Sequence, residues 1–260
     1  MAAEKFARSD GFEWLSRAGF VARGLVYGII GILAFKLALG SGGQSASQKG
    51  ALQAIAHQPF GHLLLVLVAI GLAGYSLWRL IRAILGHGPE GSDTGFQRVA
   101  AAASGIVYAG LCALAVEILV GSGGSSSGSA SGVFGWPAGV WLVGTAGAVL
   151  IAVGLYQGYR GVSHDFLKDS KTEEMSAGVR GWIKWIGTFG LLSRMVVFGL
   201  VGVFLIKAAL DYNPNKAVGL DGALAKLRDS AYGPYTLGVV ATGLVAFGLY
   251  SLSDARYRRI

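Results

Sequence analysis

Charged residues are scarce in this sequence of 260 residues: Asp, Glu, Lys and Arg make up only 14%, against about a quarter in a typical soluble domain. Hydrophobic residues account for 53%, and the mean hydropathy is +0.55. This balance argues against a soluble domain. Several nearly uncharged runs of about 20 residues are long enough for a helix to cross a hydrocarbon core of roughly 30 Å. The composition is therefore typical of an integral membrane protein.

Cysteine and proline are also rare. The single cysteine, Cys112, excludes an intrachain disulfide, and no Cys/His cluster has zinc spacing. The four histidines occupy no equivalent positions, which argues against a bis-histidyl haem. The apolar segments hold neither a Ser/His/Asp set nor paired carboxylates. We therefore expect no metal, no other cofactor and no enzymatic activity. Proline is missing from the interior of every long apolar segment, which argues against the broken helices of many transporters.

One apolar pattern occurs three times along the chain. The first and second copies are offset by 81 residues, and the second and third by 90. Internal repetition of this quality indicates a repeat architecture. The landmarks that keep their spacing are Arg23, Ser104 and Arg194, then Tyr27, Tyr108 and Phe198, then Gly31, Cys112 and Gly202, and finally Lys36, Glu117 and Lys207.

The repeats predict an all-α membrane protein with a single integral membrane domain, residues 1–260. Six transmembrane helices are expected at residues 20–39, 62–85, 99–120, 138–159, 186–210 and 235–252. They pair into three two-helix hairpin repeats, residues 14–85, 96–160 and 186–256. Because each repeat crosses the membrane twice, all three repeats have the same orientation. Such parallel repeats are related by an axis along the membrane normal. Three of them favour a pseudo-threefold bundle.

Two short segments, residues 49–57 and 219–228, place their apolar residues on one side and are too short to span a bilayer. We expect them to form helices that lie flat on the outer membrane surface.

Basic residues predict the orientation. Of the Lys and Arg residues outside the helix interiors, 16 fall on the side of the two termini and 4 on the opposite side. Both termini are therefore expected to be cytoplasmic. The net charge of +8 follows from this bias and favours anionic phospholipid of the inner leaflet as a partner. Nucleic acid is not expected, because the charges are spread over four segments.

The first repeat carries a family resemblance. It reads A-R-G-L-V-Y-G at residues 22–28, K-G-A-L at 49–52, Q-P-F-G at 58–61 and A-I-G-L-A-G-Y-S-L-W-R at 69–79. In these motifs the chain resembles domain-of-unknown-function family 1206, bacterial inner-membrane proteins with three two-helix repeats. The resemblance implies this fold and a multi-pass location in the bacterial inner membrane, and it supplies no catalytic or binding residues. Repeat two lacks the Gly-Ala-Leu and Pro-Phe-Gly elements, and a Gly/Ser tract stands in their place.

Ionisable residues inside membrane helices are the first candidates for a site. Lys36, Glu117 and Lys207 occupy equivalent positions, about one turn from the outer helix ends. Two interpretations stay open. The three side chains converge on a polar outer vestibule for a small solute or ion, or the lysines extend to the interface while Glu117 pairs with one of them.

A second group of candidates lies at the inner helix ends. These are Arg23, Arg79, Arg160 and Arg194, for which we expect anchoring and contact with lipid headgroups. Tyr75, Tyr156 and Tyr250 coincide between repeats, and we expect them to pack between helices. The sequence thus favours a non-enzymatic structural or interaction protein that contacts lipid or a membrane complex. A small-solute or ion transporter or channel is the alternative.

Overall fold

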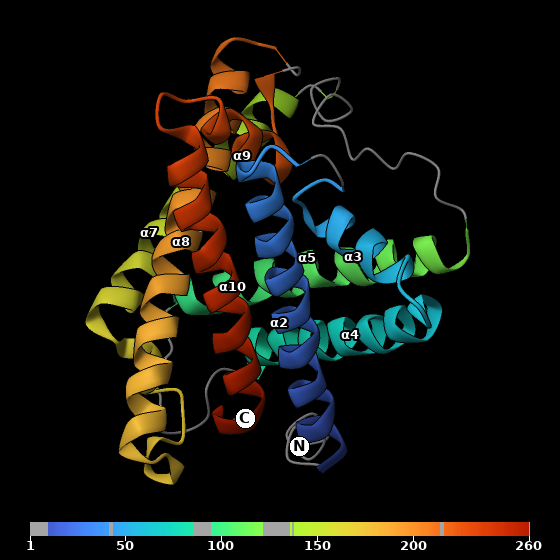
Figure 1. Cartoon of the computed structure of the whole chain (residues 1–260), viewed down its shortest axis with the longest axis vertical. Coiled ribbons are helices and arrows are strands. Elements are labelled where there is room, and N and C mark those ends of the chain that lie inside the picture. The colour runs from blue at the N-terminus through green and yellow to red at the C-terminus, as the bar shows by residue number, and fades with distance from the viewer. Residues whose placement is uncertain are drawn as a thin grey trace.

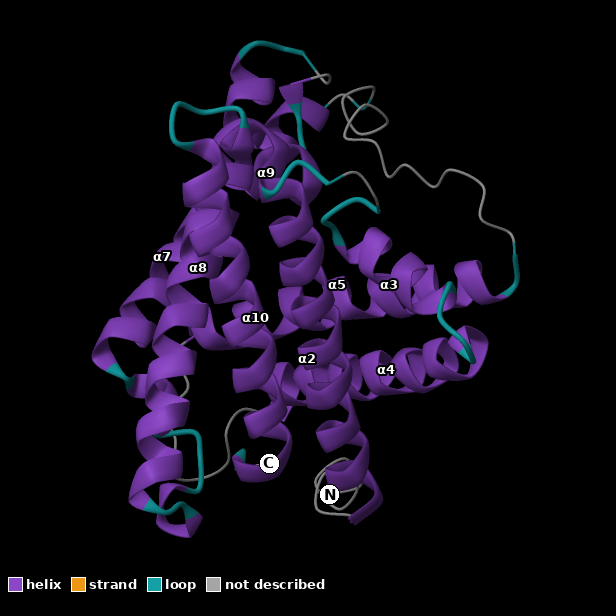
Figure 2. Cartoon of the chain, in the orientation of Figure 1, coloured by secondary structure: helices purple, strands orange, loops and turns teal. Residues whose placement is uncertain are grey.

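The computed structural model describes residues 10–41, 44–85, 95–121, 136, 138–213 and 216–259. This part of the chain is helical and contains no β-strand (Figure 2). Six of its helices are long and apolar enough to cross a membrane, as predicted. They are α2 (Asp10–Ala38), α4 (Gly61–Leu85), α5 (Gly95–Leu119), α7 (Gly139–Ser163), α8 (Ala177–Leu210) and α10 (Gly233–Tyr257).

Two helices begin about ten residues earlier than the sequence predicted. In the added turns of α2, Ser16 is completely buried and Gly19 lies directly against Tyr75 of α4. Helix α8 begins after Ser176, whose side chain accepts a hydrogen bond from the Val179 N–H at 3.4 Å. At 1.5 Å per residue, the 34 residues of α8 extend over about 51 Å, well beyond a hydrocarbon core of roughly 30 Å.

The six long helices form a row in which each packs against the next: α5, α4, α2, α10, α8 and α7 (Figure 1). Two of these contacts join the helices of one repeat, α2 with α4 and α8 with α10. The other three join different repeats, α4 with α5, α2 with α10 and α7 with α8. The first and last repeats are therefore direct neighbours.

Three two-helix repeats are thus confirmed, whereas closure around a threefold-like axis would need one more contact, between α5 and α7. In the described part of the chain these helices share at most a marginal contact, and they lie at opposite ends of the row. Figure 1 shows α4 and α5 side by side, running across α2, while α7 follows α8. The two helices of repeat two are consequently apart.

Glycines set the closest helix contacts. A Cβ added at Gly248 would lie 2.8 Å from the Gly24 carbonyl oxygen, and one at Gly190 would lie 2.6 Å from the Phe247 Cα. The backbones of α2 and α10, and of α8 and α10, can approach this far because no side chain stands between them. This tight packing places α10 at the centre of the row.

The two short segments are helices, α3 (Gln48–Ala56) and α9 (Leu220–Arg228). Their apolar sides face the other helices. Leu52 of α3 and Leu224 of α9 are completely buried. Helix α3 packs on α2, α4 and α5, and α9 packs on α8, α10 and α2. The prediction that both segments form helices is confirmed, and their amphipathic pattern reports burial against protein. That they lie on the outer membrane surface stays a prediction.

Candidate functional site

The start of α2, the end of α10 and residues 164–176 meet at one end of the molecule, here called the terminal end. Arg17 of α2 donates from Nη1 to the backbone oxygens of Ala255 at 2.6 Å and Arg256 at 2.8 Å. The connection between α7 and α8 contains two short 3₁₀ helices, Asp165–Leu167 and Thr172–Glu174. It joins the end of α10 through the Lys171 N–H, which donates to the Tyr257 carbonyl at 2.7 Å.

Arg23 is the centre of a polar site just inside the terminal end. This α2 side chain is only 5% exposed. Its guanidinium donates to the Ser251 hydroxyl at 2.6 Å, the Tyr75 hydroxyl at 2.6 Å and the Asp254 carboxylate at 2.8 Å. All three partners are themselves buried. One arginine thus ties α2 to α4 of its own repeat and to α10 of the last repeat.

Asp254 extends this site toward the α7–α8 connection. Arg258 lies 3.5 Å from the Asp254 carboxylate and donates to Asp169 at 2.8 Å. Arg160 of α7 donates to the same Asp169 oxygen at 2.6 Å. The five residues Arg23, Asp254, Arg258, Asp169 and Arg160 form one chain of ion pairs, here called the arginine–aspartate network.

The arginines around Asp169 favour the ionised form of its carboxylate. Burial alone would raise the pKa of Asp169, but Arg258, Arg160 and Arg82 outweigh it and hold that pKa below its usual range. Three arginines against two aspartates leave one surplus positive charge. The Asp254 Oδ1 and Arg258 Nε atoms are buried and have no hydrogen-bond partner. Removing one partner of a buried ion pair typically costs about 3–5 kcal/mol, because the other charge stays buried.

Aromatic rings pack against the Arg23 guanidinium. The Arg23 guanidinium lies 5.0 Å from the ring centroids of Phe20 and Tyr75. Tyr108 of α5 packs edge-on against Tyr75 with centroids 4.5 Å apart. These contacts add α5 to the helices that the site connects.

Arg194, the repeat equivalent of Arg23, lies among aromatic rings and shares the Phe247 ring with Arg23. The Arg194 guanidinium lies 4.9 Å from the ring of Tyr27, 4.8 Å from Phe198 and 4.3 Å from Phe247. Tyr27 and Phe198 belong to the second set of repeat landmarks. Arg194 thus contacts one member of that set on α2 and another on its own helix.

The proposed outer vestibule receives less support from the packing. Lys36 and Lys207 are exposed and Glu117 is half-buried. Helix α10 stands between α2 and α8, and α5 packs on α3 and α4. The helices that carry the three residues are thus separated, and their convergence stays a prediction.

Of the four arginines expected at headgroups, Arg23 is enclosed by protein, so that prediction is wrong for this side chain. The reason is that the Arg23 side chain is buried and pairs with the Asp254 carboxylate of α10. Arg79, Arg160 and Arg194 are half-buried, and headgroup contact stays a prediction for them. Arg79 donates to the Tyr75 hydroxyl at 3.0 Å. The sequence-based expectation that Tyr75 and Tyr250 pack between helices agrees with their burial.

Sequence reasoning missed Asp254, Arg258 and Asp169. One signal was available. In repeats one and two, the repeated tyrosine is followed four residues later by arginine, as in Tyr75 and Arg79. In repeat three the same position after Tyr250 is Asp254. A carboxylate that replaces arginine inside a membrane helix indicates a buried cationic partner.

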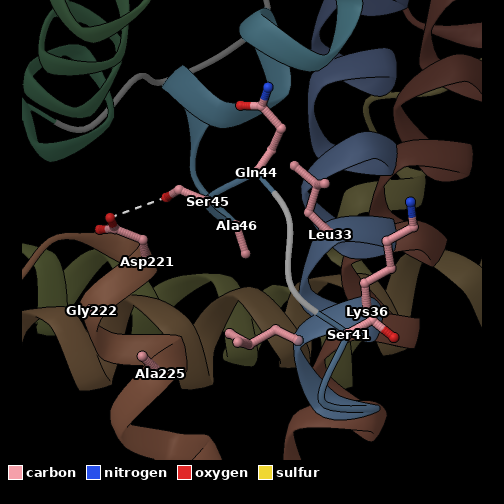
Figure 3. A pocket seen from close by; sticks show the side chains of 10 residues that line it. Leu33, Lys36, Ser41, Gln44, Ser45, Ala46, Asp221, Gly222 and Ala225 are labelled. Carbon is pink, nitrogen blue, oxygen red and sulfur yellow. Dashed lines mark hydrogen bonds between the residues drawn. The ribbon is translucent and has the colours of Figure 1, made fainter.

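A pocket of about 370 Å³ lies at the opposite end of the molecule, between α2, the following loop and α9 (Figure 3). Lys36 and Asp221 stand on different walls of it, and Ser45 donates to the Asp221 carboxylate at 3.1 Å. Glu117 and Lys207 do not line this pocket. Among the described residues, no group of His, Cys, Asp and Glu side chains is arranged to hold a metal ion.

The fold and its repeats define a class: an all-helical, multi-pass membrane protein built from three two-helix units. A family model described as "Domain of Unknown Function (DUF1206)" matches residues 18–86, 99–164 and 189–258, one pair of long helices each. The chain belongs to this family, which confirms the resemblance seen in its first repeat. An uncharacterized protein YxxB of Bacillus subtilis (strain 168) is 35% identical over 250 residues, covering 94% of this chain and 90% of the relative. No solved structure matches.

Proposed function

We propose that this protein is a non-enzymatic membrane scaffold whose terminal end binds anionic phospholipid headgroups. One observation carries the proposal. The first turns of α8 expose two cations, Arg180 and Lys184, beside two exposed tryptophans, Trp182 at 59% and Trp185 at 66%. Tryptophan with lysine or arginine is the combination that lies at membrane–water interfaces.

The length of α8 supports this placement. Because about 51 Å of helix exceeds the hydrocarbon thickness, one end of α8 must leave the apolar core. Its other end carries exposed apolar residues such as Leu210. The arginine–aspartate network contributes rigidity, since it joins the helices of all three repeats at the same end. We therefore assign the network to scaffold stability and the exposed α8 cations to lipid.

The test compares full-length protein in neutral detergent with and without added phosphatidylglycerol. A ligand that binds only the folded state raises the melting temperature. We expect phosphatidylglycerol to stabilise the unmodified protein more than phosphatidylcholine does. Replacing Arg180 and Lys184 by Gln should remove roughly 1 kcal/mol per residue of this attraction. Lys216→Gln with Lys226→Gln, exposed at the opposite end, is the matched control. If phosphatidylglycerol raised the melting temperature of both double variants equally, the proposal would be contradicted.

The pocket beside Lys36 favours a second candidate, a protein that takes up a small solute or ion. The pocket is open to the outside of the bundle and carries both a cation and a carboxylate. Under this alternative, Lys36→Gln lowers solute flux into vesicles that contain the protein, while Lys49→Gln leaves it unchanged. No flux above that of empty vesicles for anions, cations or amino acids would remove this candidate.

A further inference from the structure

The two helices of repeat two present faces that the other repeats cover. In repeat one, α2 and α4 cross where Ala22 meets Gly71, and a Cβ added at Gly71 would lie 2.7 Å from the Ala22 Cβ. In repeat three, α8 and α10 cross where Ser193, the equivalent of Ala22, meets Gly243, about one turn before the equivalent of Gly71. The corresponding residues of repeat two, 81 positions after those of repeat one, are Ala103 on α5 and Ala152 on α7. Both are exposed.

Each of these residues lies within a continuous exposed face. On α5 the face follows helical spacing through Val99, Ala103, Ile106, Gly110 and Ala113, all exposed. On α7 it follows Trp141, Thr145, Ala148 and Ala152, all exposed as well. The share of buried residues is lowest in α5 and α7, at 22% each; it is 28% in α8 and 50% to 61% in α2, α4 and α10.

A groove marks the α7 face. It has a volume of about 300 Å³ and lies between the first half of α7 and the last half of α8, with Trp141, Thr145 and Ala148 in its lining. Ala152 follows Ala148 by one helical turn on the same exposed face of α7. The groove therefore borders the position that corresponds to Gly71.

We propose that a second copy of this chain fills both faces, with α5 of each copy packed against α7 of the other. A contact between the two helices of one repeat is formed twice within the chain, in repeats one and three, and each occurrence shows that an odd helix and an even helix of one repeat fit together. Within one copy, α5 and α7 are held at opposite ends of the row by α4 and α8. A twofold dimer satisfies both faces at once, because an isologous interface uses each contact twice. This inference is independent of the lipid proposal.

The test uses cysteine cross-linking of the full-length protein in membranes, in a Cys112→Ala background. Differently tagged Ala103→Cys and Ala152→Cys chains are co-expressed and oxidised. We expect a disulfide-linked dimer that carries both tags. The negative control pairs Ala103→Cys with Val239→Cys instead, and these chains should not link. Val239 is 58% exposed and lies on α10. Gly144→Cys with Ala209→Cys is the positive control within one chain, since the corresponding Cβ atoms would lie 3.4 Å apart, within disulfide range.

Two results would overturn the dimer. In the first, a chain that carries both Ala103→Cys and Ala152→Cys forms only an intrachain disulfide. That result would show that α7 of the same chain covers α5. If neither experiment gives a link while the positive control does, lipid covers both faces. Both substitutions are at exposed positions, so the variants are expected to fold, and their melting temperatures check this.

Discussion

The guanidinium of Arg23 and the carboxylate of Asp254 lie 2.8 Å apart, although 231 residues separate them in the sequence. Both side chains are buried, and the pair connects the first long helix to the last. Because α10 also packs against α8, this one contact holds the first and third repeats in register.

Removing the Asp254 charge should destabilise the protein strongly. We expect Asp254→Asn to lower the free energy of unfolding by about 3–5 kcal/mol, because Arg23 and Arg258 keep their buried charges. Asp211→Asn, which breaks an exposed pair with Lys216, should cost about 1 kcal/mol or less. Thermal unfolding in detergent measures both.

A double variant separates the charge effect from packing. Arg23→Met combined with Asp254→Leu removes both charges and should recover much of the loss, since apolar replacement of a buried pair is often neutral. If the double variant melts no higher than Asp254→Asn alone, the loss does not come from an unpaired charge.

The sequence predicted the helices and repeats well because their signal is local. Apolar runs of spanning length and fixed offsets between landmarks need no knowledge of tertiary contacts. The arginine–aspartate network is different, since it depends on α10 lying beside α2, and no local pattern carries that adjacency. Repeat equivalence also directed attention to Lys36, Glu117 and Lys207. Equivalence places residues together only if the repeats close around an axis, whereas α5 and α7 lie apart.

Acid should weaken the terminal end through Asp169. Its pKa in the folded protein is below the ordinary value of about 3.9, so the unfolded state binds more protons and stability rises with pH in this range. The contribution of Asp169 is complete above pH 4 to 5 and is lost as the pH falls through its lowered pKa. We expect Asp169→Asn to reduce the melting temperature at pH 6 and to flatten its decline between pH 5 and pH 3. Asp229→Asn, an exposed carboxyl after α9, should leave the shape of that decline unchanged.

Two glycines of α8 provide a matched pair for the packing of α8 and α10. A Cβ at Gly190 would press on the Phe247 backbone at 2.6 Å, whereas one at Gly199 would meet nothing within 4 Å. Gly190→Ala should therefore cost about 1–3 kcal/mol, as overpacking usually does. Gly199→Ala should be neutral or stabilising by up to about 1 kcal/mol, because alanine favours helix. Equal melting temperatures would show that α8 and α10 are not in close contact in the membrane.

The orientation in the membrane can be tested at the two ends of the molecule. The structure places the start of α2, the end of α10 and the α7–α8 connection together, and these segments carry most of the basic residues. The positive-inside rule therefore predicts that this end faces the cytoplasm. Single-cysteine variants in a Cys112→Ala background should therefore react with an impermeant thiol reagent in intact cells at Gln44 and Asn213. Lys171→Cys should react only after the membrane is opened. Labelling of Lys171→Cys in intact cells, with Gln44→Cys protected, would reverse the orientation and place the cations of α8 outside the cell.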